Sequence, residues 1–119
     1  MEARLDDPEA FITSNQNFHL RIAKAAKNHI LEDFIINIRN LLKSNIALVI
    51  EKSAISRRSL GYHRRIFEAV RNGDVSRARR TMAEHIVDIE KEFIKILYQP
   101  PPSLKTSELK SRKAELNIE

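Results

Sequence analysis

Apolar residues recur along this chain every three or four positions, the spacing of one face of an α-helix. Four segments show this pattern, and they predict four main helices. The first begins at Asp7-Pro8-Glu9, because aspartate caps free N–H groups and proline suits the first helical position, and we expect it to stop at Asn28. Its inward stripe comprises Phe11, Ile12, Asn15, Phe18, His19, Ile22, Ala23 and Ala26.

The second segment runs from about residue 29 to residue 52. Residues 36–50 are apolar on much of the helix circumference, which predicts a central and largely buried helix. Asn45 is the one polar residue on its stripe. The stripe comprises Leu31, Phe34, Ile35, Ile38, Leu41, Leu42, Asn45, Leu48 and Val49.

A Ser-rich stretch, residues 53–59, is predicted to separate the second helix from a third. Asn72-Gly73-Asp74 then marks the turn into a fourth, because glycine adopts the left-handed conformation and aspartate caps the next helix. The third helix turns Leu60, His63, Ile66, Phe67 and Val70 inward; the fourth turns Ala78, Met82, His85, Ile86, Ile89, Phe93, Ile96 and Leu97 inward.

These elements predict an all-α fold, an antiparallel helical bundle. We expect one domain over residues 1–99, followed by a Pro-rich break and a charged tail over residues 100–119, because Pro100-Pro101-Pro102 cannot continue a helix. Ser107 could cap a short helix within that tail.

Composition narrows the possible chemistry. The 119 residues include two glycines and no cysteine, which excludes glycine-rich nucleotide loops, disulfide scaffolds and thiolate zinc sites. No apolar run is long enough for a membrane span, and the first residues lack a signal-peptide pattern. We therefore expect a soluble, cytoplasmic protein.

Three of the four histidines lie on inward stripes, each on a different predicted helix. A single His19, His63 or His85 would ordinarily be a hydrogen-bonded core residue, but three could converge inside a bundle. Asn15 lies four residues before His19, so its amide oxygen leaves the same helix face. Such donors suit Zn, Ni, Co, Mn or Fe ions. His29 is read as a surface or boundary residue.

The residues around these histidines resemble a known family. Asn15-Gln16-Asn17-Phe18-His19 and the alanines up to Asn28 resemble the D-x-x-F-H…A-x-x-x-x-N signature of the FCD domain. Tyr62 to Asp74 and Ala78 to Ile86 resemble its E-H-x-x-I-x-x-A-I-x-x-G-D and A-x-x-x-M-x-x-H-I runs. The resemblance spans about residues 7–98. It suggests the effector-binding domain of FadR-subfamily, GntR-type transcription regulators.

The resemblance implies a central cavity in which an Asp and three His hold a divalent metal, here Zn, Ni or Mn, beside a small carboxylate effector. The matching positions are Asn15, His19, His63 and His85, so Asn15 replaces the Asp and weaker metal binding is expected. Apolar residues 46–50 stand where arginines are common, and Asn45 becomes a weak candidate for effector contact. A homodimer is implied, with DNA bound through a winged-helix domain that this chain lacks.

The sequence leaves two other function classes open. Residues 57–80 hold eight arginines against two acidic residues, which could serve a helical interaction or nucleic-acid-binding module with purely structural histidines, or could form a solvated outer face. A metalloenzyme would need a general base, but Glu68 and Glu84 are phased outward, so we expect no enzyme activity.

Overall fold

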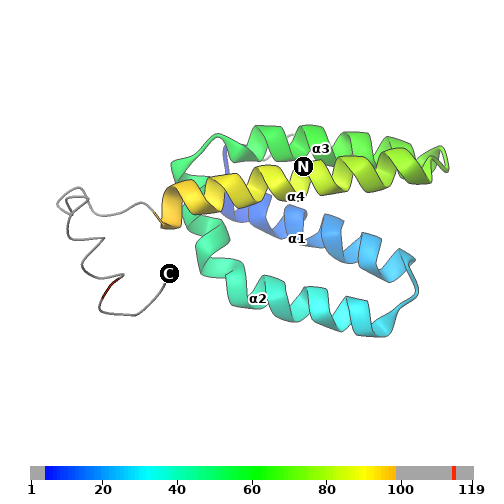
Figure 1. The fold of residues 1–119 in the computed structure, drawn as a ribbon, viewed down its shortest axis with the longest axis horizontal. Coiled ribbons are helices and arrows are strands. Elements are labelled where there is room, and N and C mark those ends of the chain that lie inside the picture. Colours follow the sequence, from blue (N-terminus) through cyan, green and yellow to red (C-terminus); the bar gives the residue numbers. More distant parts are fainter. Residues whose placement is uncertain (1–4, 99–113, 115–119) are drawn as a thin grey trace.

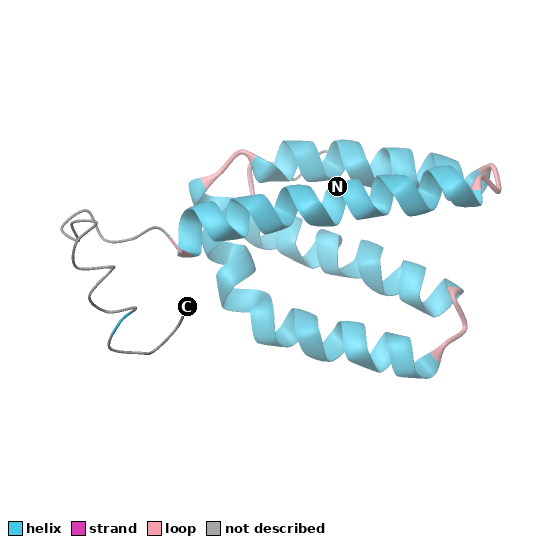
Figure 2. Cartoon of the chain, viewed as in Figure 1, coloured by secondary structure: helices cyan, strands magenta, loops and turns pink. Residues whose placement is uncertain are grey.

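Over residues 5–98 the fold is formed by four helices joined by short loops (Figure 2). The structure is a computed structural model that describes residues 5–98 and residue 114. The helices are α1 (Pro8–Ala25), α2 (His29–Lys52), α3 (Ile55–Arg71) and α4 (Val75–Leu97). The described residues contain no strand, which confirms the all-α prediction. The domain boundary at residue 99 and the proposed cap at Ser107 lie outside the described residues.

The helices form two antiparallel hairpins. The most extensive contacts join α1 to α2 and α3 to α4, with smaller contacts from α2 to α4 and α3. Figure 1 shows the hairpins meeting near the link between α2 and α3 and diverging toward their own turns. The bundle is therefore closed at one end and spread at the other.

Capping side chains fix three of the helix starts. Asp7 accepts a hydrogen bond from the Ala10 N–H at 3.1 Å, as predicted, and Asp74 accepts one from the Arg77 N–H at 3.0 Å. Asn28 was expected to stop the first helix, but it caps the second, accepting from the Leu31 N–H at 3.1 Å. Each such cap satisfies a backbone donor that has no partner within the helix.

The turn between α3 and α4 has the hydrogen bonds of a Schellman motif. Gly73, at φ +68°, donates its N–H to the Val70 carbonyl at 3.1 Å, and the Asp74 N–H reaches the Ala69 carbonyl at 2.8 Å. The expectation for Asn72-Gly73-Asp74 is confirmed. After α1, Lys27 adopts the same left-handed conformation, with φ +52°. Because this residue is a lysine and not a glycine, the sequence did not predict a left-handed residue there.

The Ser-rich stretch over residues 53–59 was predicted to be a separating segment, and this is wrong. Only Ser53 and Ala54 lie between the helices, and α3 begins at Ile55. The Ser53 hydroxyl donates to the Val49 carbonyl at 2.8 Å and accepts from the Ile55 N–H at 3.3 Å, so one side chain bonds to both helix ends. Serine disfavours helix interiors only weakly, and helix packing overrides that preference.

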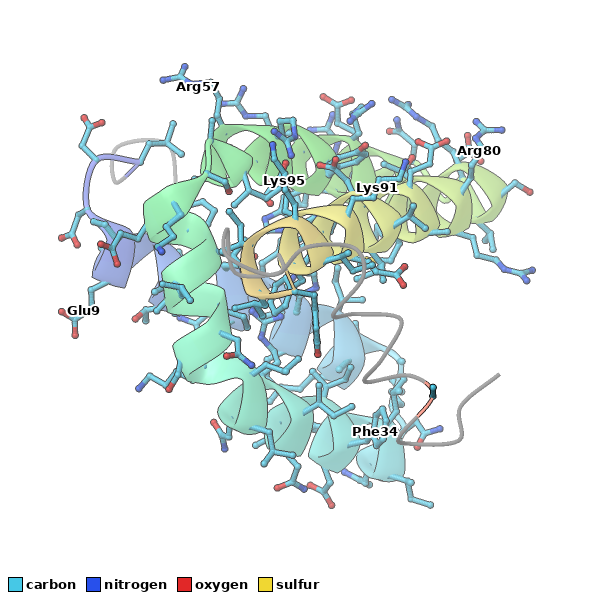
Figure 3. All side chains as sticks on the ribbon, turned by 60° about the vertical axis from the view of Figure 1, so that its left-hand side comes forward. Glu9, Phe34, Arg57, Arg80, Lys91 and Lys95 are labelled. Atoms are coloured by element: carbon cyan, nitrogen blue, oxygen red, sulfur yellow. The ribbon has the colours of Figure 1, made fainter. Side chains whose placement is uncertain are left out.

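The prediction of a largely buried helix over residues 36–50 is also wrong. Val49 is the only buried residue of α2, whereas Phe34 is 58% and Leu41 80% exposed. Figure 3 shows Phe34 on the first turns of α2. Helix α2 packs mainly along α1, and the divergence of the hairpins leaves much of its apolar surface open.

The divergence of the hairpins also affects the exposure of three apolar residues of the α3–α4 hairpin. Phe67, Val70 and Ile86 were expected to point inward, and each is more than half exposed, although Ile86 still lines a cavity. Phe67 and Val70 lie in the last turns of α3, where the hairpins have separated (Figure 1). The largest fully buried side chains are Phe11, Ile66, His85 and Val49. A histidine thus belongs to the core itself.

Candidate metal centre and adjoining cavity

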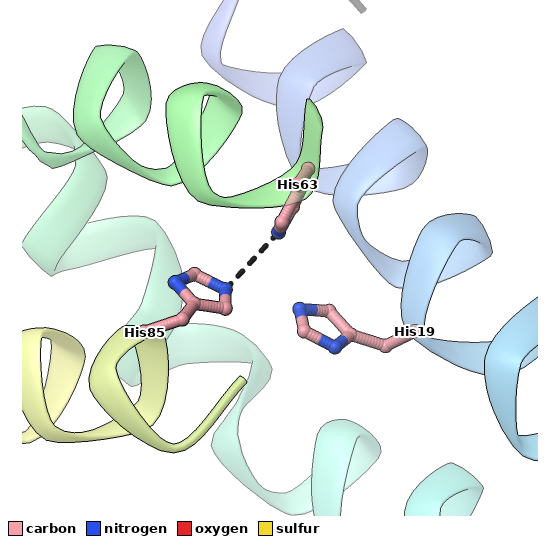
Figure 4. A group of neighbouring side chains, drawn as sticks. All are labelled: His19, His63 and His85. Carbon is pink, nitrogen blue, oxygen red and sulfur yellow. Dashed lines mark hydrogen bonds between the residues drawn. The ribbon is translucent and has the colours of Figure 1, made fainter. Parts of the chain in front are cut away.

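Three imidazoles from three helices meet inside the bundle. Figure 4 shows His19 of α1, His63 of α3 and His85 of α4 with their rings turned toward one another. The Nε2 atoms of His63 and His85 are 3.1 Å apart, and one ring nitrogen from each histidine lies within 4.8 Å of the other two. The stripes of the sequence predicted this convergence.

Ring packing holds the three imidazoles in place. The Phe18 ring stacks on His63 with centroids 4.0 Å apart, and the Tyr62 ring lies 5.2 Å from His85. The His19 and His85 rings are nearly parallel with centroids 5.4 Å apart, and both are nearly perpendicular to His63. Side chains packed in this way keep defined rotamers, so the nitrogens stay aimed at one point.

Burial keeps these histidines neutral. It lowers the pKa of His19 from 6.5 to about 3, and repulsion from Arg39 and the other two imidazoles adds to the shift. Burial likewise lowers the pKa of His63 to about 3, with contributions from His85 and Arg39. Burial lowers the pKa of His85 to about 4, although Asp88 opposes the shift. Near pH 7 each neutral ring has one unprotonated nitrogen, as a metal ligand must, and the Nε2 atoms of His63 and His85 share a hydrogen bond.

The donor set fits a divalent ion. Two Zn–N bonds of about 2.0–2.1 Å place neighbouring nitrogens about 3–3.5 Å apart, close to the 3.1 Å between His63 and His85. The Asn15 Oδ1 and His85 Nδ1 atoms are buried without a hydrogen-bond partner. Asn15 is only 5% exposed, and it lies one turn before His19. A buried carbonyl oxygen without a donor costs folding free energy, and an ion beside the imidazoles would satisfy it.

A cavity of about 410 Å³ adjoins this cluster. Asn15 and His19 are part of its wall, together with Arg39, Ser59 and Glu90. The rest of the wall is apolar and dominated by isoleucine. These apolar residues are Phe11, Ile35, Ile38, Leu42, Ile46, Val49, Ile50, Ile55, Ile86, Ile89 and Phe93. A volume of this size suits a small organic ligand.

A comparison with models of protein families identifies the family of this chain. A sequence model of the FCD domain matches residues 1–88. The chain belongs to the FCD domain family. This domain is the C-terminal, effector-sensing domain of GntR-family regulators, a regulatory rather than catalytic class. No curated protein and no solved structure matched the chain. No helix in the described part of this FCD domain is both long and apolar enough to cross a membrane.

Sequence reasoning missed Arg39 of this FCD domain. Its side chain lines the cavity, and its Nε and Nη2 atoms are buried without a hydrogen-bond partner. Burial lowers the pKa of Arg39, and its charge in turn lowers the pKa of all three histidines. A signal was present in the sequence. Arg39 falls in phase with the cavity-lining positions 35, 42, 46 and 49, spaced by alternating steps of four and three.

Asn45, the weak effector candidate, is not brought to the cavity of the FCD domain. It is exposed and is absent from the cavity wall. Its neighbours Leu42, Ile46 and Val49 line the cavity, and Asn45 lies at the edge of their face. The exposed His29, whose ring lies 3.8 Å from Glu32, also stays apart from the cluster.

The arginines of residues 57–80 cover the outer side of the FCD domain. Figure 3 shows Arg57 and Arg80 projecting away from α3 and α4. Arg58 is paired with Asp88 at 3.1 Å and with Glu92 at 2.7 Å, joining the two helices. Seven of the eight are exposed, while Arg77 is intermediate in burial. Glu68 and Glu84 are exposed as expected, so neither provides a buried general base.

Proposed function

We propose that this FCD domain binds a divalent metal ion, Zn²⁺, Ni²⁺ or Mn²⁺, and with it senses a small carboxylate. His19, His63 and His85 would be the imidazole ligands, and Asn15 would add its amide oxygen. The observation that carries the proposal is the meeting of three neutral imidazoles from three helices within 4.8 Å, of which His19 also lines a ligand-sized cavity. The family supports it, because FCD domains sense effectors.

The chain would supply a second cation for the carboxylate. A bound divalent ion would contribute positive charge and an open coordination position for an anionic oxygen of the ligand. Arg39 lies on α2 at the same cavity, and its buried N–H groups lack partners that a carboxylate would provide. A guanidinium can hold a carboxylate through two parallel hydrogen bonds, which fixes the orientation of the ligand.

Binding at this place would couple the two hairpins. Arg39 and His19 belong to the first hairpin, whereas His63 and His85 belong to the second. A ligand that interacts with both would favour the arrangement in which they lie closer together, a shift of population between conformations. In a homodimeric regulator that shift would change the spacing of winged-helix domains and therefore DNA affinity.

Metal titration tests the metal site. Adding Zn²⁺, Ni²⁺ or Mn²⁺ to chelator-treated protein should raise the free energy of unfolding by about 2.7 kcal/mol when the free metal reaches 100 times Kd. Replacing both His63 and His85 by Ala should abolish the response, whereas His29→Ala should leave it intact because His29 is exposed. A double variant that responds like the parent would refute the site.

The carboxylate role of Arg39 is tested separately. Arg39→Gln should weaken carboxylate binding at least about tenfold in the presence of metal, because one charged hydrogen-bonding partner contributes about 1.5–3 kcal/mol. Isothermal titration with metal alone should still give affinity within a few fold of the parent. Lys43→Gln is the matched control, since Lys43 lies one turn later on α2 and is exposed. Equal carboxylate binding by all three proteins would contradict the role.

A further inference from the structure

The cavity differs in character from one end to the other. Along α1 its wall passes from Phe11 through Asn15 to His19, over eight residues or about 12 Å of helix. Because α1 and α2 are antiparallel (Figure 1), Arg39 lies toward the His19 end and Val49 toward the Phe11 end. His19 and Arg39 therefore lie toward one end of the cavity with Asn15 midway along α1, and most of the remaining wall is hydrocarbon.

The apolar end offers almost nothing to a polar ligand group. Beyond Asn15, His19 and Arg39, the polar members of the wall are Ser59, a single hydroxyl, and Glu90. A second carboxylate placed there would lose part of its hydration without meeting a cation, which disfavours binding. Glu90 would repel it as well. Hydroxyl groups along the ligand would meet isoleucine side chains that cannot hydrogen-bond.

From this polarity we propose that the ligand is a monocarboxylate with an apolar tail several carbons long. The carboxylate lies at the Arg39 and His19 end, and the tail lies along the isoleucines toward Phe11 and Val49. The inference rests on the proposed function for its carboxylate head, and it adds the chemical class of the rest of the ligand. It excludes hydroxy acids, sugar acids and dicarboxylates as the preferred effectors.

A chain-length series measures the contribution of the tail. Straight-chain monocarboxylates from acetate to decanoate are titrated into the protein with Zn²⁺ present, and Kd is measured by calorimetry. Each added methylene should tighten binding about fourfold until the cavity is full, because burying one CH₂ changes affinity by about that factor. Malate and citrate serve as polar comparators and should bind more weakly than hexanoate.

Two neighbouring leucines of α2 provide a matched pair of variants. Leu42 lines the cavity and is 37% exposed, whereas Leu41 is 80% exposed and outside the wall. Leu42→Asn should weaken octanoate binding at least about tenfold and leave acetate binding nearly unchanged. Leu41→Asn should leave both unchanged. Both positions are partly exposed, and a thermal melt of each variant verifies that it folds.

The outcomes separate this inference from the proposed function. If citrate and malate bind as tightly as octanoate, or if affinity does not change with chain length, the apolar tail is refuted while the carboxylate sensor stands. If octan-1-ol binds as tightly as octanoate, the placement of the carboxylate at Arg39 is refuted. If neither metal nor any carboxylate changes the melting temperature, both proposals fail. The expected slope with chain length, reduced in Leu42→Asn and unchanged in Leu41→Asn, supports the inference.

Discussion

The net charge of the candidate metal centre depends on Asn15, whose side chain is a neutral amide. Asn15 contributes no negative charge, so three neutral imidazoles and an amide would leave a divalent ion with its full +2 charge. Arg39 adds another positive charge nearby, as its effect on the histidine pKa values shows. The expected consequence is weaker metal binding but stronger attraction of an anionic ligand.

Asn15→Asp should strengthen metal binding. A carboxylate beside a divalent ion adds direct attraction, and even after its desolvation cost we expect Kd to fall at least about tenfold. Asn17→Asp is the control, because Asn17 lies on the exposed side of the same helix and the substitution adds the same charge. Competition titration with a chelator gives both values. Equal affinities for the two variants would mean that Asn15 is not a ligand.

Individual residues also show what the sequence could and could not predict. His19, His63 and His85 were found because each is polar within an apolar stripe that packing must turn inward. Arg39 obeys the same periodicity but was missed, because a charged residue is ordinarily read as exposed. The position of Asn45 outside the cavity wall was not predictable, for a different reason. The second segment is apolar on so many sides that its sequence does not specify which side faces the cavity.

Among the elements, local signals predicted helix boundaries better than burial. Asp7 and Asp74 cap their helices because an N-cap needs only the next three residues. The start of α3 at Ile55 was not predictable from its serines, since their weak preference yields to helix packing. The exposure of α2 depends on how the hairpins diverge, and that is a property of the whole arrangement that no single segment encodes.

The only two glycines of the sequence provide a test of element stability with opposite signs. Gly73→Ala should lower the free energy of unfolding by about 1 kcal/mol, because Gly73 has φ +68° at the end of α3 and a side chain is strained there. Gly61→Ala should raise it by about 0.5–1 kcal/mol, since Gly61 is inside α3 and an added Cβ meets nothing within 4 Å.

Urea denaturation of the two glycine variants gives both values. The metal response of Gly61→Ala should match the parent, which shows that the histidine cluster is undisturbed. Destabilisation by Gly61→Ala would indicate that α3 tolerates no added methyl beside His63, contrary to the space around this position.

At the scale of the whole molecule, the buried imidazoles couple folding to protons and to metal. The unfolded chain binds a proton on each histidine below pH 6.5, whereas the folded protein keeps them neutral down to about pH 4 or pH 3. Protonation therefore favours unfolding, and metal binding favours the folded state. The same three nitrogens serve both equilibria, so acid should release metal and loosen the bundle together.

The metal-free protein should lose stability as pH falls through 6.5. Between pH 7.5 and pH 5.5 each histidine that stays neutral when folded contributes about 1.4 kcal/mol to the loss, so three contribute about 4 kcal/mol. Because single domains are stable by only about 5–15 kcal/mol, mild acid should bring this one close to unfolding. Urea denaturation at a series of pH values with chelator present measures the change.

Variants tie that acid sensitivity to the cluster. His85→Gln should reduce the loss between pH 7.5 and pH 5.5 by about a third, whatever its effect on stability at pH 7.5, because one of three titrating groups is gone. His29→Gln should leave the loss unchanged, since His29 is exposed and apart from the cluster. Carboxylates with ordinary pKa values do not titrate in this window and cannot produce the effect. A stability that is constant from pH 7.5 to pH 5.5 would show that the three imidazoles are hydrated and free to ionise in the folded protein, and the preformed set of neutral ligands would then not exist.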